Sequence, residues 1–369
     1  MKTMMLRCER CGSTWPLDTR LWKCRCGGLF ALDGVPPFAR EHIEQSDPSL
    51  WRYAACLPPI ESQYRVSLGE GYTPLVSAPH PRLRLYHKLE FLAPTSSFKD
   101  RGSTILASVL TGLGIEEVVE DSSGNAGASL AAYCARAGIS ADIYVPDYTS
   151  SGKLAQILVY GGNLTKVPGP RERSAEAVLR AADAGSYYAS HYYNPFVLEG
   201  MKTVAYEIAE QLGWASPDNI VSPAGNGTLL LGIWRGFQRL LRAGAIASLP
   251  RIYAVQAQSC APIFRAFRTG AEDVAPIEGT RTIAEGIAIA APVRGREILA
   301  AIRESGGCVV TVTDEEVISA RRQLASLGLY VEPTSATAQA AVAKLAPHLQ
   351  EGEITVVPLT GSGLKSHGK

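Results

Sequence analysis

The stretch Ala93-Pro94-Thr95-Ser96-Ser97-Phe98-Lys99-Asp100-Arg101-Gly102 decides the fold, because it places one lysine between a strand-like run and a helix. Pro94 ends the run at residues 83–90, and apolar residues recur at helical spacing from 105 to 113. A lysine in the first turn of a helix lies where the helix dipole disfavours a cation, so its amine should lose a proton more easily than a surface lysine does. Such an amine is suited to bonding a carbonyl group. The alternative is a solvated lysine beside Asp100.

Three further glycine-rich loops follow apolar runs, as loops that bind cofactors do. They are Asp121-Ser122-Ser123-Gly124-Asn125-Ala126-Gly127, Ser222-Pro223-Ala224-Gly225-Asn226-Gly227-Thr228 and Leu359-Thr360-Gly361-Ser362-Gly363. The first two precede helical patterns, so their backbone amides should point at an anion. Helix capping is the alternative for the first loop, and a plain turn for the third. With Lys99, these loops predict one site assembled from four segments.

Short apolar runs alternate with helical patterns from residue 118 onward, which predicts an α/β fold with parallel sheets and helices on both faces. Strands are expected at 118–119, 141–145, 163–167, 219–222, 252–256, 309–312 and 354–358. Helices are expected at 126–137, 152–160, 174–184, 198–212, 229–241, 296–304, 315–327 and 337–345.

Length and composition favour a globular protein that acts on small molecules. The chain has 369 residues, of which 46% are hydrophobic, enough for two substantial domains and a small appendage. Its net charge of +1 gives no basic field for nucleic acid or an anionic membrane surface. No apolar run approaches the roughly 20 residues of a spanning helix. The first residues lack a signal-peptide core, so we expect a cytoplasmic location with reduced thiols.

Four of the eight cysteines cluster near the amino terminus as Cys8-x2-Cys11 and Cys24-x-Cys26. The pairs lie near glycines in a polar segment too short for its own core, which predicts a zinc-ribbon-like segment at residues 1–33 with structural Zn²⁺. A metal-free remnant and a redox pair are the alternatives. We expect the ribbon to matter little for chemistry. Residues 34–66, rich in proline and aromatic residues, predict an arm that wraps the body or a partner subunit.

Taken in order, these motifs resemble the threonine synthase family, pyridoxal-phosphate enzymes of the tryptophan-synthase β-subunit fold (fold type II). The resemblance runs from about Gly69 to Lys365 and includes Val331-Glu332-Pro333-Thr334-Ser335-Ala336. It implies a large domain at 67–100 and 213–369 and a small domain at 101–212, with the cofactor in the cleft between them. Relatives of this fold are commonly dimers, so we expect a homodimer.

The resemblance also assigns roles to single residues. Lys99 would form a Schiff base with pyridoxal 5'-phosphate and then move protons at the substrate carbons. A neutral hydroxyl at the pyridine nitrogen, rather than a carboxylate, would favour elimination and replacement over transamination. The other assignments are Asn125 at the ring hydroxyl, Gly225, Asn226, Gly227 and Thr228 at the cofactor phosphate, Thr360 at the pyridine nitrogen, and Ser122 and Ser123 at the substrate carboxylate.

One segment departs from the family pattern Asn-Ser-x-Asn-Pro-x-Arg, because Val197 stands where the family has a phosphate-binding arginine. We expect His191 and Asn194 to line the substrate phosphate pocket, with Lys153 as the added cation. The activity implied is the conversion of O-phosphohomoserine and water to threonine and phosphate. The alternatives are a threonine or serine dehydratase, a β-replacement enzyme resembling cysteate synthase, and a binding protein that has lost catalysis.

Overall fold

The computed structural model describes residues 4–169 and 171–366, and the chain divides into two compact units. The first unit contains residues 1–71 and 99–200, and the second contains residues 72–98 and 201–369. The sequence predicted domain boundaries at residues 100 and 212, whereas the units change at residues 98 and 200. The predicted ribbon and arm belong to the first unit.

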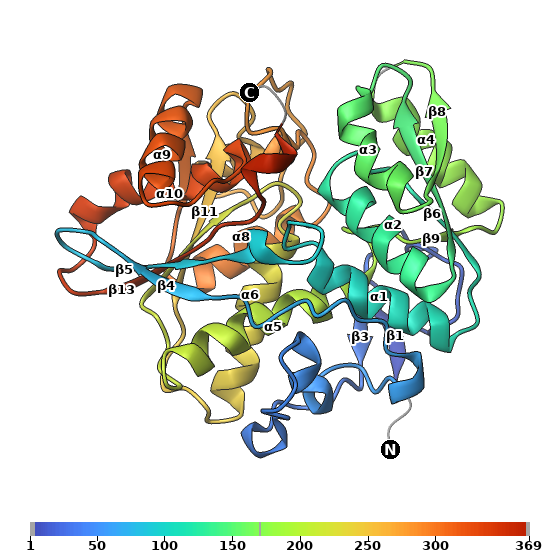
Figure 1. Ribbon diagram of the computed structural model, residues 1–369, viewed down its shortest axis with the longest axis horizontal. Helices are drawn as coiled ribbons and strands as arrows, with labels where there is room; N and C mark the ends of the chain where they lie inside the picture. The colour runs from blue at the N-terminus through green and yellow to red at the C-terminus, as the bar shows by residue number, and fades with distance from the viewer. Residues whose placement is uncertain (1–3, 170, 367–369) are drawn as a thin grey trace. The chain divides into compact units, whose positions relative to one another are not determined.

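The first unit is built on a four-stranded parallel sheet with the strand order β8-β7-β6-β9. Its strands are β6 (Glu117–Glu120), β7 (Ser140–Pro146), β8 (Asn163–Val167) and β9 (Tyr187–Tyr188). Its helices are α1 (Asp100–Gly112), α2 (Asn125–Ala137), α3 (Ser151–Val159) and α4 (Arg171–Asp183). Figure 1 shows α4 alongside β6, β7 and β8, and α2 packs against β7 and α1. Helix α5 (Pro195–Gln211) begins in this unit and ends in the second.

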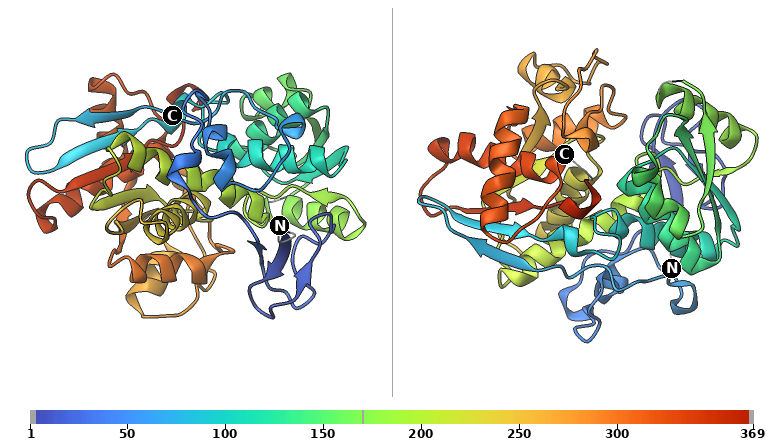
Figure 2. Two further views of the ribbon diagram at one scale, coloured as in Figure 1. Left: turned by 90° about the horizontal axis from the view of Figure 1, so that it is seen from below. Right: turned by 45° about the horizontal axis from the view of Figure 1, so that its top comes forward.

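The ribbon forms its own antiparallel sheet of β1 (Met5–Cys8), β2 (Thr14–Trp15) and β3 (Phe30–Asp33), with β1 in the centre. Figure 2 shows these strands in dark blue as a small separate sheet. The arm packs on α1 of its own chain: Trp51 is buried, and its Nε1 donates to Thr104 Oγ1 at 3.2 Å. Gly71 is the last residue of the stretch 1–71 and has φ +101. A Cβ at this position would lie 2.4 Å from the Leu50 amide nitrogen.

The second unit has a six-stranded sheet with the order β12-β11-β10-β13-β5-β4, in which only β4 pairs antiparallel to its neighbour. Its strands are β4 (Leu75–Ala78), β5 (Arg84–Lys88), β10 (Asn219–Pro223), β11 (Arg251–Ala257), β12 (Val309–Val312) and β13 (Ile354–Pro358). Its other helices are α6 (Thr228–Arg242), α7 (Pro262–Arg268), α8 (Gly295–Glu304), α9 (Asp314–Ser326) and α10 (Pro333–Leu345).

The core of the second unit lies where α10 covers β10, β11 and β12 (Figure 1). Helix α10 is rich in alanine, and Ala336, Ala338 and Ala341 are fully buried. Small side chains let the helix backbone approach the sheet closely, so alanine at these positions is a packing requirement. The parallel sheets with crossover helices confirm the predicted α/β class. No helix among residues 4–169 and 171–366 is long and apolar enough to cross a membrane.

Candidate active site

Lys99 is the N-cap residue of α1, as the sequence predicted, and its side chain is half-buried. The backbone before it is tied into the second unit, because Phe98 N–H donates to Thr360 O at 3.0 Å and Ser97 forms a β-bridge with Gly361. The side chain of Asp100 is buried and accepts a hydrogen bond from Ser129 Oγ at 2.6 Å. Lys99 is therefore fixed between two ordered segments, which is unlike a solvated surface lysine.

Two buried hydroxyl groups lie side by side at Thr360, one from the loop and one from Ser335 in α10. Ser335 Oγ lies 2.9 Å from Thr360 Oγ1, and it also accepts a hydrogen bond from Gly361 N–H at 2.7 Å. Ser362, by contrast, accepts a hydrogen bond from Leu364 N–H within its own turn. In the described residues, the buried hydroxyl of Ser97 has no hydrogen-bond partner. Neutral donors and an unsatisfied buried hydroxyl suit a bound polar group better than an apolar one.

The loop Gly225–Thr228 leads directly into α6, whose N-cap residue is Gly227 with φ +74. No side chain caps the first amides of this helix, although Thr228 and Leu229 are buried. A Cβ on Gly225 would lie 3.1 Å from Gly286 O and 3.2 Å from Ile287 Cα, so the loop is narrow at this point. Uncapped amides at the positive end of a 15-residue helix fit a phosphate group.

The loop at Ser122 and Ser123 leads into α2, whose N-cap residue is Gly124. Gly124 has no side chain with which to cap the helix, and its own N–H donates to Ser122 Oγ at 3.4 Å. A Cβ on Gly127 would lie 1.8 Å from Ser122 O, which shows how closely the loop folds over the first turn of the helix. Asn125, the first residue of α2, is half-buried. This geometry fits a carboxylate at the helix N-terminus.

A small cavity in the first unit brings Lys99 together with His191 and Val197, and also with Glu120, which the sequence analysis did not select. Glu120 Oε1 lies 2.7 Å from His191 Nδ1, and both side chains are largely buried. Burial and the neighbouring charge of Asp121 raise the pKa of Glu120 well above its usual range. Burial and the positive charge of Lys99 lower the pKa of His191. An acidic residue at the carboxyl end of a parallel strand was the available signal for Glu120.

Comparison with known proteins identifies the family. The model of the pyridoxal-phosphate dependent enzymes matches residues 66–361. The threonine synthase of Methanocaldococcus jannaschii is 38% identical, covering 98% of this chain and 93% of the relative. That of Methanosarcina acetivorans is 37% identical, covering 92% of this chain and 86% of the relative. The chain belongs to the threonine synthase family of pyridoxal-phosphate dependent enzymes.

Solved structures agree with this family at the level of fold. The processed form of threonine deaminase isoform 2 from Solanum lycopersicum superposes with a TM-score of 0.72 at 22% identity, covering 83% of this chain and 88% of that one. Maize serine racemase superposes with a TM-score of 0.68 at 22% identity, covering 79% of this chain and 88% of that one. The predicted fold type II architecture is confirmed.

His191 and Asn194, both assigned to the substrate phosphate, line different cavities. His191 lines the cavity of Lys99. Asn194 lines a different cavity, which faces the ribbon; its Nδ2 donates to the hydroxyl of Tyr187 at 3.0 Å and its Oδ1 accepts from Phe196 N–H at 3.0 Å. Those bonds start α5 and occupy both ends of the amide. Lys153 belongs to the first turn of α3, and its side chain lies outside the described part of the chain.

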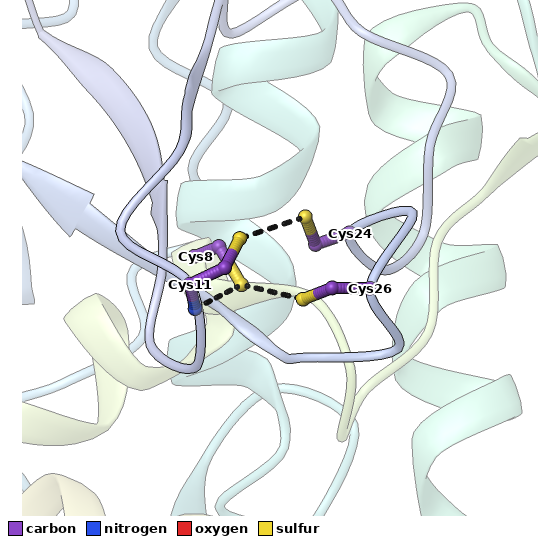
Figure 3. Close-up of side chains that lie close together, drawn as sticks. All are labelled: Cys8, Cys11, Cys24 and Cys26. Atoms are coloured by element: carbon purple, nitrogen blue, oxygen red, sulfur yellow. Dashed lines mark hydrogen bonds between the residues drawn. The ribbon is translucent and has the colours of Figure 1, made fainter.

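The four amino-terminal cysteines converge, as Figure 3 shows. Their sulfur atoms all lie within 4.8 Å of one another, with Cys8 to Cys26 at 3.5 Å and Cys11 to Cys24 at 3.6 Å. Tetrahedral zinc with bonds of about 2.3 Å has sulfurs about 3.8 Å apart, so the cluster is compatible with a four-coordinate metal site. Cys8 and Cys24 are buried under the ribbon core with Phe30. The other four cysteines are free of disulfides.

Proposed function

We propose that this chain is a pyridoxal-phosphate-dependent lyase that converts O-phosphohomoserine and water to threonine and phosphate. The observation that carries the proposal is Lys99, which starts α1 and lines a cavity in a chain of the threonine synthase family. The uncapped N-terminus of α6 and the hydroxyl pair at Thr360 support a phosphate-bearing cofactor with an aromatic nitrogen.

Bound pyridoxal 5'-phosphate supplies an aldehyde that bonds amines and a conjugated ring that accepts the electron pair released at the substrate α carbon. Lys99 supplies the amine that holds it. The backbone amides of the loop Gly225–Thr228 bind its phosphate, and Asn125 donates to its ring hydroxyl. The loop fits a phosphate because no side chain caps the first amides of α6.

Thr360 would bind the ring nitrogen, with Ser335 as the partner of its hydroxyl. Because Ser335 Oγ is 2.9 Å from Thr360 Oγ1 and also bonds the Gly361 amide, the threonine hydroxyl is held in one orientation. A neutral hydroxyl does not keep the ring nitrogen protonated as a carboxylate would, which favours elimination and replacement.

The substrate is oriented by its carboxylate, which the amides of residues 122–125 bind at the start of α2. Lys99 holds and moves a proton, first at the α carbon and then at the β carbon. Phosphate then departs from the γ carbon, and water adds at the β carbon. His191 is the phosphate-side residue that shares a cavity with Lys99, with Asn194 and Lys153 as the further assignments from sequence.

Three finer features belong to the same proposal. The cysteine cluster holds structural Zn²⁺, supported by the convergence of four sulfurs. We place the enzyme in the cytoplasm as a homodimer, and the dimer is the part of this assignment that rests on the family resemblance. Its partner molecules are small amino acids, in keeping with a net charge of +1.

A substrate comparison tests the proposal. Purified protein loaded with pyridoxal 5'-phosphate should release threonine and phosphate in equal amounts from O-phosphohomoserine, measured by amino-acid analysis and a phosphate assay. Parallel incubations with threonine and serine test the dehydratase alternative, which Val197 beside Lys99 raises. Formation of 2-oxo acids from threonine or serine, with no threonine made from O-phosphohomoserine, would contradict the proposal.

A further inference from the structure

The cavity beside Lys99 has one polar wall and one apolar wall. Glu120 and His191 form the polar wall, while Leu106, Leu130 and Val197 supply apolar surface. Its volume of about 10 Å³ is close to what one water molecule needs, so a small polar group fits there. Val197 is only 3% exposed and offers no charge. Polar groups in this cavity come from Lys99, from Ser103 and from the pair of Glu120 and His191; Ser103 Oγ already lies 2.8 Å from Ser129 Oγ.

The Glu120–His191 pair is a specific contact. The side chain of Glu120 is 1% exposed and that of His191 16%, with 2.7 Å between Oε1 and Nδ1. Within the described part of the chain, the second carboxyl oxygen of Glu120 has no hydrogen-bond partner. A buried carboxyl with one oxygen left without a hydrogen-bond partner and with the charge of Asp121 nearby is costly to keep ionised, so this carboxyl is suited to carrying a proton.

The hydrogen bond at Nδ1 determines what Nε2 does. If Glu120 carries the shared proton, Nδ1 accepts it and the ring hydrogen must be on Nε2. If the proton lies on the ring, both nitrogens carry hydrogen. In either state Nε2 is a donor, and it becomes an acceptor only when the pair loses one proton. The raised pKa of Glu120 and the lowered pKa of His191 both favour the first state.

We propose that His191 donates a proton from its Nε2 atom to the phosphate that leaves the substrate. Glu120 holds the imidazole ring in position and supplies a replacement proton to Nδ1. This inference rests on the proposed function. Val197 lines the cavity and supplies no positive charge that could neutralise a departing phosphate. A proton donor stabilises the same charge by a different route. His191 is thus a catalytic residue, and Glu120 is a positioning residue that acts through it.

The proton balance closes over one turnover. The bond between the γ carbon and the phosphate oxygen breaks, and its electron pair stays on that oxygen, which takes the Nε2 proton. Nδ1 takes the proton of Glu120, which becomes a carboxylate. The water that adds at the β carbon gives up a proton to Nε2, and Nδ1 returns its proton to Glu120. No additional oxidant, reductant or acid is consumed.

The pair should give the phosphate-releasing step an alkaline limit. Donation needs the pair to hold its proton, so kcat should be constant at low pH and fall as the pH rises through the apparent pKa of the pair. The raised pKa of Glu120 moves that fall to higher pH than an ordinary carboxyl would give. The charged and titratable groups around the pair are Lys99 before α1, Asp121 after β6, Arg171 at the start of α4, and the hydroxyls of Tyr188 and Tyr192.

Two variants and two reactions test the proposal. Phosphate release from O-phosphohomoserine is measured against pH in Glu120→Gln and His191→Asn. Exchange of the α proton of L-2-aminobutyrate in D₂O is followed by NMR. This amino acid has no leaving group, so its exchange rate reports only the proton transfer by Lys99. Glu117→Gln, an exposed carboxyl on the same strand, is the matched control. If His191→Asn fails to fold, Glu120→Gln, which keeps the side-chain volume, carries the test.

We expect His191→Asn to lower kcat for phosphate release by about 10²-fold, the usual contribution of a general acid, with α-proton exchange unchanged. Glu120→Gln should lower kcat and remove the alkaline fall, while KM changes little because the amide still donates to Nδ1. The proposal would be overturned if both variants released phosphate at the wild-type rate with the wild-type pH profile. It would also be overturned if the variants lost α-proton exchange to the same extent as phosphate release. A wild-type protein that exchanges the α proton but releases no phosphate contradicts the proposed function itself.

Discussion

At the scale of single residues, Lys99 is the position whose loss should abolish chemistry without unfolding the protein. It is half-buried at the N-cap of α1, and no side-chain cap depends on it. We expect Lys99→Ala to lose turnover and the absorbance band of the lysine-bound cofactor, with the midpoint of thermal unfolding of the cofactor-free protein unchanged. Lys166→Ala, an exposed lysine of β8, is the control. Full activity in Lys99→Ala would remove the basis for the whole site.

The sequence predicts roles for residues that belong to a local motif, but it does not reveal contacts between residues that are far apart in the chain. Lys99 and the loop at Gly225 follow from a strand, a turn and a helix N-terminus, which are short-range features. Ser335 lies 25 positions from Thr360, and Glu120 lies 71 positions from His191, so neither contact can be read from spacing. Asn194 shows the reverse case, because a local bond to Phe196 N–H uses the amide that the motif suggested for substrate.

At the scale of elements, the ribbon is linked to a loop of the candidate site through one tryptophan. Trp22 lies two residues before Cys24, and its ring packs edge-on against Tyr193 at 4.7 Å and Tyr188 at 6.3 Å. Tyr188 in turn donates to Asp121 Oδ1 at 2.7 Å, directly before Ser122. The sequence alone predicted a ribbon of little chemical consequence, but these contacts connect it with the loop that we propose binds the substrate carboxylate.

We therefore expect removal of the metal to weaken substrate binding as well as to unfold the ribbon. Each aromatic contact of Trp22 is worth about 0.5–1.5 kcal/mol, so KM should rise by roughly 2- to 10-fold. The measurement is zinc content, Trp emission and KM before and after treatment with a chelator, with Cys11→Ser as the genetic counterpart. Cys308→Ser, a half-buried cysteine outside the cluster, is the control. Complete metal loss with unchanged KM would rule out this coupling.

Elements with strong periodicity were predicted within a few residues, whereas short ones were missed. The helix expected at 229–241 is α6 (Thr228–Arg242), and the strand expected at 354–358 is β13. Strand β9 has only two residues, and α7 has seven. Neither element is long enough for a repeating pattern of apolar residues to be recognised in the sequence. Both are fixed by neighbours: β9 by pairing with β6, and α7 by packing on α8 and β12.

At the scale of the whole molecule, the division into units could not be read from the order of elements. The first 71 residues join residues 99–200 because of packing such as Trp51 against Thr104, which lies 53 positions away. Helix α5 continues through the change of unit at residue 200, so no turn or glycine-rich linker marks it. Local patterns predict where helices begin, but a unit boundary depends on which surfaces bury one another.

Within the second unit, one buried ion pair should be costly to break by removing a single partner. Lys88 Nζ at the end of β5 lies 2.6 Å from Glu207 Oε2 on α5, and both side chains are 0% exposed. Glu207 also accepts the backbone N–H groups of Tyr72 and Thr73, at 2.7 and 3.2 Å. The pair therefore fixes α5 to the segment where the unit begins, and removing one partner leaves a buried charge without its counter-charge.

We expect Lys88→Met to lower the free energy of unfolding by about 3–5 kcal/mol, measured by urea denaturation of the cofactor-loaded protein. Lys88→Met combined with Glu207→Leu should recover part of this loss, because the double variant buries no unpaired charge. Arg173→Ala, which breaks an ion pair whose side chains are 64% and 54% exposed, is the control and should change stability by less than about 1 kcal/mol. A Lys88→Met protein as stable as the wild type would mean that Glu207 becomes protonated at little cost, and that the backbone amides of Tyr72 and Thr73 suffice to hold α5 in place.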